Sequence, residues 1–239
     1  MTSWLSIALV TAGIACGADS VRAADPAPPA KLADTLAQRL AACAICHGKD
    51  GEGTGGATYY PRIGGKPARY LYLQLQNFRE GRRRYPQMVY LMRYMTDEYL
   101  QEIADYYSKL QPPYTPPTPP PMTTRERERG ETLANQGDAA KNIPACAACH
   151  GKTFAGMQPA IPGLVGLNFD YIAAQLSAWK TGARRANAPD CMHEVATRLV
   201  ATDISSVAKW LAARQGTTGQ RPAPEAAQKL PLSCGGQAR

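Results

Sequence analysis

Histidine and long apolar runs are both scarce in this chain of 239 residues. Two of its three histidines end copies of the same five-residue motif, so His193 is the one further histidine that either copy can use. The apolar run Trp4–Cys16 is too short to cross a bilayer comfortably. No other stretch is long enough, so the sequence predicts no membrane-spanning helix.

The first residues indicate export. Trp4–Cys16 is followed by Val21-Arg22-Ala23, which fits the small-residue pattern of a cleavage site. We therefore expect a signal peptide over residues 1–23 and a mature protein in the periplasm. No Lys or Arg precedes the apolar run, and Cys16 poorly matches a lipoprotein signal, so an uncleaved or lipidated anchor is the alternative.

One motif occurs twice, as Cys43-Ala44-Ile45-Cys46-His47 and as Cys146-Ala147-Ala148-Cys149-His150. C-x-x-C-H is the attachment signature of a c-type haem. The two cysteines form thioethers with the porphyrin, and the histidine binds its iron. A zinc site needs four clustered ligands, whereas the copies lie 103 residues apart. A redox C-x-x-C motif needs no histidine after it. The sequence therefore predicts two covalently bound haem c groups.

The second half of the chain repeats the first. Beyond the haem motifs, Pro61 matches Pro162 at an offset of 101, and Met88 matches Met192 at an offset of 104. Seven of the twelve residues 111–122 are prolines, which is typical of a semi-extended linker. We predict an all-α fold of two tandem domains with these boundaries: signal peptide 1–23, first domain 24–111, proline-rich linker 112–122, second domain 123–215 and irregular tail 216–239.

Apolar periodicity predicts three helices in the first domain, over Lys31–Ala44, Tyr70–Gly81 and Thr96–Leu110. Thr96 has the side chain of an N-cap and is followed by two acidic residues. Met88 follows Pro86, and we expect it in a loop.

The cysteines outside the haem motifs predict a disulfide. Four of the seven cysteines belong to the haem motifs and Cys16 to the signal, which leaves Cys191 and Cys234. Export favours a disulfide between these two.

The net charge of +8 suits an acidic partner or a peripheral association with a membrane surface, although ordinary solubility explains it equally well. Export argues against nucleic acid as a partner.

The whole mature chain resembles the dihaem class I cytochromes c of the cytochrome c4 type. The resemblance rests on the two haem motifs, on Pro61-Arg62-Ile63-Gly64-Gly65 with the helix after it, on the matched methionines and on the linker. It implies an exported electron carrier with two all-α domains and His/Met-ligated haems. It also implies that the Pro61 and Pro162 carbonyls accept a hydrogen bond from the haem-binding histidines.

The irons need a ligand on each side. His47 and His150 are the expected proximal ligands. Met88 is the expected sixth ligand of the first haem, whereas Met92 and Met95 suit packing. For the second haem the repeat favours Met192, with the adjacent His193 as the alternative.

With both axial positions filled, we expect an electron-transfer protein rather than an enzyme. It would carry electrons from a quinol-oxidising complex or a periplasmic dehydrogenase to a terminal oxidase. The alternative is a dedicated electron-accepting subunit of one dehydrogenase, for example one that oxidises thiosulfate or an alcohol. A dihaem peroxidase would need an open iron and a distal acid–base group, for which Glu194 is the one hint. The arginine runs 82–84 and 184–185 either neutralise haem propionates, meet an acidic partner or form a solvated turn.

Overall fold

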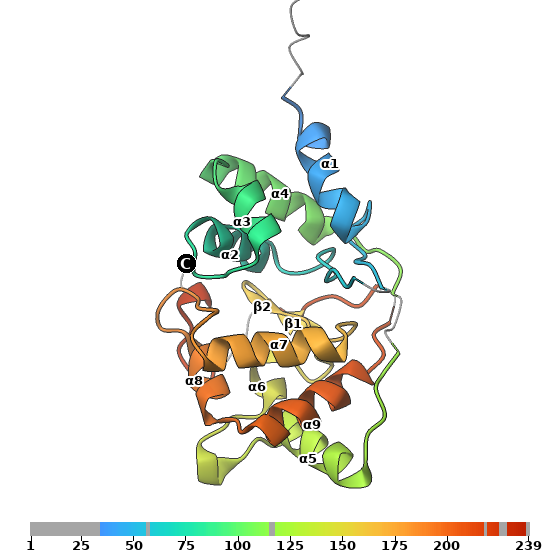
Figure 1. The fold of residues 1–239 in the computed structure, drawn as a ribbon, viewed down its shortest axis with the longest axis vertical. Helices are drawn as coiled ribbons and strands as arrows, with labels where there is room; N and C mark the ends of the chain where they lie inside the picture. Colours follow the sequence, from blue (N-terminus) through green and yellow to red (C-terminus); the bar gives the residue numbers. More distant parts are fainter. Residues whose placement is uncertain (1–33, 56–57, 115–117, 218, 225–228, 238–239) are drawn as a thin grey trace, which may run out of the picture. The chain divides into compact units, whose positions relative to one another are not determined.

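Helices dominate the part of the chain that the computed structural model describes, which comprises residues 34–55, 58–114, 118–217, 219–224 and 229–237. The predicted signal peptide and Cys16 lie outside these residues. Two groups of helices follow one another along the chain (Figure 1). The first group contains α1 (Leu36–His47), α2 (Ala68–Arg79), α3 (Pro86–Met92) and α4 (Asp97–Lys109). The second contains α5 (Thr124–Asn135), α6 (Cys146–His150), α7 (Phe169–Lys180), α8 (Cys191–Arg198) and α9 (Ala201–Ala212).

Short elements complete the second group. The strands β1 (Gly156–Met157) and β2 (Ile161–Pro162) pair antiparallel, with Gly156 opposite Pro162. Single 3-10 turns lie at η1 (Ala139–Lys141) and η2 (Gly235–Gln237). The β pair departs from a purely helical fold but is only two residues long on each side.

The helix ends follow from local capping. Helix α1 begins at Leu36 rather than at Lys31, because Thr35 and Gln38 form a reciprocal capping box. The predicted N-cap Thr96 of α4 is confirmed, since its side chain accepts from the Tyr99 N–H. The expectation that Met88 lies in a loop is wrong. Pro86 occupies the first turn of α3, where its fixed φ favours a helix start.

Each group of helices has its own core. In the second group Phe154 and Trp210 are buried in edge contact, with ring centroids 5.5 Å apart. Gly130 on α5 allows close approach to α9, because a Cβ there would lie 2.5 Å from the Ser206 carbonyl oxygen. In the first group, Leu100, Ile103 and Tyr107 of α4 are buried, and Tyr106 beside them is half-buried.

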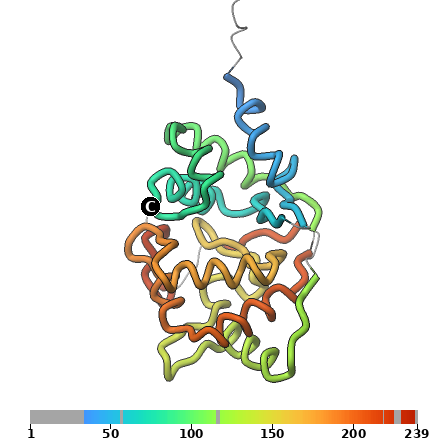
Figure 2. Tube along the Cα trace, in the orientation of Figure 1, coloured from blue at the N-terminus to red at the C-terminus, as the bar shows by residue number. Residues whose placement is uncertain are grey.

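The described residues of the linker, 112–114 and 118–122, lie on the right-hand side of the view in Figure 2. Arg62 fixes the start of the linker, donating to the carbonyls of Pro112 and Pro113 at 2.8 Å each. Cys191 and Cys234 form the predicted disulfide, which is thereby confirmed. It ties the tail to the first residue of α8.

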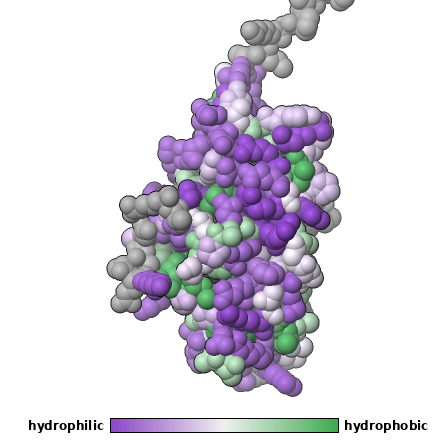
Figure 3. Space-filling model, turned by 90° about the vertical axis from the view of Figure 1, so that its left-hand side faces the viewer, coloured by the Kyte–Doolittle hydropathy of each residue, from purple (hydrophilic) through white to green (hydrophobic). Residues whose placement is uncertain are grey.

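One face of the molecule is largely polar. On the face shown in Figure 3 hydrophilic residues predominate, and hydrophobic ones gather only in small areas. None of the helices described here combines the length and the apolar character that a membrane span requires.

Candidate haem sites

The first haem motif lies at the end of α1, which carries Cys43, Cys46 and His47 in its last two turns. Gly48 follows with a φ of +82°, a conformation that favours glycine and turns the chain away from the helix axis. The His47 side chain is buried, and its Nδ1 lies 2.8 Å from the Pro61 carbonyl oxygen. The glycine-rich loop after the motif thus brings Pro61 back beside the imidazole of His47.

The second motif has the same construction on a shorter helix. Helix α6 carries Cys146, Cys149 and His150, and Gly151 follows with a φ of +81°. His150 is buried, and its Nδ1 lies 2.8 Å from the Pro162 carbonyl oxygen. The predicted hydrogen bonds from both histidines to proline carbonyls are therefore confirmed.

These bonds fix the chemistry of the imidazoles. A carbonyl only accepts, so Nδ1 of each ring carries the proton and Nε2 carries the free lone pair. Burial lowers the pKa of His47 and of His150, which favours the neutral ring. A neutral imidazole with its orientation fixed by a backbone carbonyl is suited to bind a metal through Nε2.

One cavity of about 620 Å³ brings all the predicted site residues together. Its lining is mostly apolar and comes from both groups of helices. The eight predicted site residues all contribute to it: Cys43, Cys46, His47, Met88, Cys146, Cys149, His150 and Met192. None of the four motif cysteines takes part in the disulfide, so all four are available to form thioethers.

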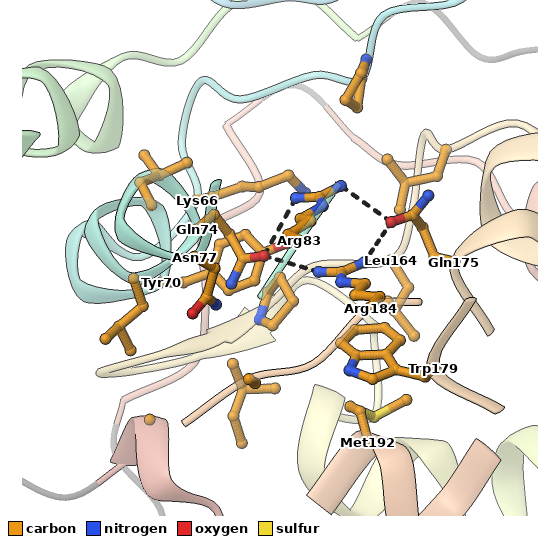
Figure 4. Close-up of a pocket in the computed structure, with 18 of the residues that line it drawn as sticks. Lys66, Tyr70, Gln74, Asn77, Arg83, Leu164, Gln175, Trp179, Arg184 and Met192 are labelled. Carbon is orange, nitrogen blue, oxygen red and sulfur yellow. Dashed lines mark hydrogen bonds between the residues drawn. The ribbon is translucent and has the colours of Figure 1, made fainter. Parts of the chain in front are cut away.

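The methionines and His193 differ in their positions. Met88 on α3 and Met192 on α8 both line the cavity, and Figure 4 shows Met192 near Trp179. His193 is exposed, and its Nδ1 donates to the Trp179 carbonyl oxygen at 2.8 Å. Met92 is 1 % exposed and packs in the core with Phe78.

The two halves meet through a network of two arginines and two glutamines (Figure 4). Arg83 donates to Oε1 of Gln74 at 3.2 Å and to Oε1 of Gln175 at 3.0 Å. Arg184 donates to the same two oxygens, at 2.8 and 2.6 Å. Each arginine thus contacts one glutamine of its own half and one of the other half.

This junction concentrates positive charge away from water. Arg184 is buried, and burial together with the neighbouring Arg83 lowers its pKa to about 10. Among the residues with described positions, neither guanidinium has a carboxylate within salt-bridge distance. A solvated basic turn therefore does not describe Arg83 and Arg184, whereas Arg84 and Arg185 are exposed. The network suits an anionic group in the cavity.

Two further donors point to the same conclusion. The Tyr107 hydroxyl and the Trp179 indole Nε1 are buried on the cavity wall and have no hydrogen-bond partner in the described structure. A buried donor without an acceptor is costly. Haem c offers carboxylate acceptors, vinyl groups for the four thiols and an iron for the two Nε2 atoms. The residues present therefore fit two haem c groups.

Several of these residues were not singled out from the sequence. Gln74 and Gln175 match one another in the repeat, and the occurrence of the same polar residue at equivalent positions of two amphipathic helices could have indicated a shared role. Lys66 carried no such signal, because its counterpart at the offset of 101 is Leu167. The Lys66 Nζ donates to the Gly163 carbonyl oxygen of the other half at 2.9 Å, and burial lowers its pKa to about 8.

Comparison with known sequences finds cytochromes. A family model described as cytochrome c matches residues 32–124. A thiosulfate dehydrogenase electron acceptor from Thiomonas intermedia (strain K12) is 40% identical over 174 residues, covering 73% of this chain and 79% of that protein. A protein of the same description from Stutzerimonas stutzeri (strain A1501) is 34% identical, covering 75% and 82%. A cytochrome c4 from Azotobacter vinelandii is 29% identical, covering 72% and 84%.

Solved structures agree. Reduced recombinant cytochrome c4 from Pseudomonas stutzeri matches with a TM-score of 0.63 and 26% identity, over 75% of this chain and 97% of that one. A thiosulfate dehydrogenase from Marichromatium purpuratum matches with a TM-score of 0.65 and 33% identity, over 72% of this chain. The match covers 36% of that longer chain, so it spans about a third of it.

Proposed function

This chain belongs to the dihaem class I cytochromes c of the cytochrome c4 type and carries two covalently bound haem c groups, and on that basis we propose that it is the electron acceptor of a thiosulfate dehydrogenase. Its fold is the predicted one, two helical cytochrome c domains joined by a proline-rich linker. Electron transfer is the function common to its relatives.

The observation that supports the finer proposal is the 40% identity to a named thiosulfate dehydrogenase electron acceptor over most of both chains. Coupling of two thiosulfate ions to one tetrathionate forms one S–S bond and releases two electrons. A protein with two one-electron sites takes up both. The second candidate is a general carrier between a quinol-oxidising complex and a terminal oxidase, which the 29% identical cytochrome c4 supports.

The side chains would divide the work as follows. Cys43, Cys46, Cys146 and Cys149 tether the two haems, whose irons supply a one-electron couple when bound. His47 and His150 present Nε2 from rings held by proline carbonyls. Arg83 and Arg184 would hold haem carboxylates at the junction between the domains.

The sixth ligands in this proposal are Met88 and Met192. Both line the cavity, whereas His193 is exposed and already donates to a backbone carbonyl. A thioether from each of these residues would raise the potential of the iron that it binds and would leave that iron no position for peroxide. Replacement of Met192 by His should lower one of the two potentials, and His193→Ala should change neither.

The proposal also covers location. An exported protein in the periplasm suits both the predicted signal peptide and covalent haem attachment. A peripheral association with a membrane surface remains consistent with the net charge of +8.

The test is reduction by a defined partner. The oxidised dihaem protein is mixed with a purified thiosulfate dehydrogenase and thiosulfate, and haem reduction is followed by stopped-flow absorbance. We expect both haems to be reduced within seconds, and much more slowly without the dehydrogenase. A matched reaction uses a purified quinol-oxidising complex with quinol. Fast reduction by that complex alone would contradict the proposal and favour the general carrier.

A further inference from the structure

The exposed large apolar residues of the described chain are distributed unevenly between the domains. Ile45, Tyr85, Tyr90 and Tyr94 belong to the first domain, and only Val200 belongs to the second. A fully buried aromatic side chain removes about 150–250 Å² from water, and the exposed tyrosines keep part of that area available to a partner. The uneven distribution therefore suggests that the two domains do not meet partners in the same way.

Two of these tyrosines and one arginine form a continuous surface, here called the tyrosine–arginine patch: Tyr90, Arg93 and Tyr94. The Arg93 guanidinium lies 4.3 Å from the ring centroid of Tyr90 and 4.6 Å from that of Tyr94. Tyr90 is 63 % exposed and Tyr94 is 84 % exposed. The cation therefore holds two rings together at the surface without burying them.

The patch lies at the end of the helix that carries the proposed ligand of the first haem: Tyr90 is on α3, Arg93 is its C-cap and Tyr94 follows. Met88, Leu91 and Met92 on α3 line the cavity, whereas Tyr90 on the same helix points to solvent. A helix with its side chains is about 10 Å across. A protein seated on the patch would thus lie about one helix diameter from the cavity that fits the first haem.

The charge of this segment is of one sign. Residues 82–95 contain four arginines and no Asp or Glu. Arg82 pairs with Glu80, but Arg84 and Arg93 have no carboxylate within salt-bridge distance among the residues whose positions are described. Such a surface complements a partner that presents carboxylates.

The equivalent helix of the second domain lacks all of these features. At the offset of 104, Glu194 stands in the place of Tyr90 and Arg198 in the place of Tyr94, and the two form an ion pair. The eight residues of α8 include no Tyr, Phe or Trp. The repeat thus supplies an internal comparison in which only α3 is built for contact.

We propose that the tyrosine–arginine patch at the end of α3 is the docking surface for the electron-donating dehydrogenase, and that electrons enter through the first domain. The partner face that fits it has an apolar hollow for the two rings and carboxylates around that hollow. Tyrosine and arginine are the residue types that most often dominate binding energy at such contacts. This inference rests on the proposed function and adds which domain and which side chains the dehydrogenase meets.

A protein partner fits the patch better than a membrane does. The rings lie on and just after α3, whose Met88, Leu91 and Met92 line the cavity, so a partner with a redox centre of its own would be close to the first haem site. Binding to vesicles of anionic phospholipid is kept as one outcome of the test, because arginine and tyrosine also suit a lipid surface.

The test compares variants in the second-order rate constant for reduction by purified thiosulfate dehydrogenase with thiosulfate. The variant Tyr90→Ser/Tyr94→Ser should slow this reaction about tenfold to a hundredfold. Val200→Ser removes an exposed apolar side chain from the second domain and should change it less than twofold. Ascorbate, a small reductant that needs no docking, should reduce all of these proteins at the same rate, which shows that the haem sites are intact.

Charge reversal gives a second measurement. Arg93→Glu should slow reduction about tenfold at low salt, and the effect should shrink towards 1 M salt. Lys109→Glu makes the same charge change on α4, where the side chain is exposed, and should slow the reaction much less.

The outcomes separate the two proposals. If the dehydrogenase reduces the unmodified protein and the tyrosine variant equally fast, the docking inference is wrong and the proposed function stands. If the tyrosine variant loses binding to phosphatidylglycerol vesicles but not its reaction rate, the patch is a membrane contact and the inference is overturned. If the dehydrogenase fails to reduce the unmodified protein, the proposed function is wrong, and the inference falls with it.

Discussion

Removal of the Cys191–Cys234 disulfide is the perturbation whose size follows most directly from the structure. The bond joins the tail to the first residue of α8, directly before Met192. The tail also contacts the same loop through the backbone, since the Gly235 N–H donates to the Pro189 carbonyl oxygen at 2.9 Å. We expect the disulfide to stabilise the second domain and to restrict the segment that carries Met192.

The magnitude comes from the loop that the bond closes. The two cysteines are 43 residues apart in the sequence. In the chain-entropy model, a loop of that length lowers the entropy of the unfolded chain by about 13 cal/mol/K, which is about 4 kcal/mol at 25 °C. The variant Cys191→Ser/Cys234→Ser should therefore lower the free energy of unfolding of the second domain by about 4 kcal/mol.

The assay is guanidinium unfolding followed by far-UV circular dichroism, with haem absorbance as a second probe. The unmodified protein is the control, and the haem irons of both proteins are kept oxidised, because a reductant would reduce the irons as well as the disulfide. The sulfur-to-iron charge-transfer band reports separately whether Met192 is bound to iron. In the double variant, we expect this band to weaken for one haem at denaturant concentrations below the main transition.

Two results would refute this reasoning. A stability change below about 1 kcal/mol would show that the tail is already restricted in the unfolded chain, so that the bond adds no constraint. A full 4 kcal/mol loss with the charge-transfer band unchanged up to the main transition would show that the bond stabilises the domain without acting on the Met192 segment.

Three more predictions concern single side chains. Asp203→Asn should destabilise the second domain by about 3 kcal/mol, because the buried Asp203 pairs with Arg129 at 2.7 Å. Arg129 lowers the pKa of Asp203, so the ion pair stabilises the folded protein above the unfolded-state pKa of the carboxyl group. In acid unfolding, the unmodified protein should lose this stabilisation below about pH 4, whereas the variant has none to lose. Lys66→Met should lower the reduction potential of the second haem by about 59 mV, a tenfold change in its reduction equilibrium, because a cation beside the site favours the reduced iron. Redox titration checks this, with Lys109→Met as the control. Equal shifts in the potentials of both haems would contradict it. Gln175→Leu removes an acceptor from both junction arginines and should split the calorimetric transition into two, whereas a single unchanged transition would show that the network does not couple the domains.

Much of the site was predictable because its chemistry is local. The spacing of the cysteines and His47 is set by one porphyrin edge and one helical turn, so the motif is visible without any tertiary contact. The pairing of Cys191 with Cys234 followed from the oxidising compartment and from the other cysteines having a use. The cap at Thr96 depends on a side chain and a backbone group three residues apart.

The rest depended on contacts that no local pattern encodes. Helix α3 is seven residues long, too short for a periodic signal, and its proline suggested a loop although proline also begins helices. The donors at Tyr107 and Trp179 are unpaired only because folding buries them against the cavity. The position of Lys66 is defined by its contact with Gly163 of the other domain, and the residues next to Lys66 in the sequence do not indicate that contact.

The junction of arginines and glutamines has a consequence for the history of the molecule. Arg83 reaches Gln175 while its equivalent Arg184 reaches Gln74, so residue i contacts j and j contacts i. This is the contact pattern of an isologous two-fold dimer. A single ancestral domain with one such glutamine and one such arginine would already have been self-complementary. Fusion of two copies would then have preserved a ready-made interface.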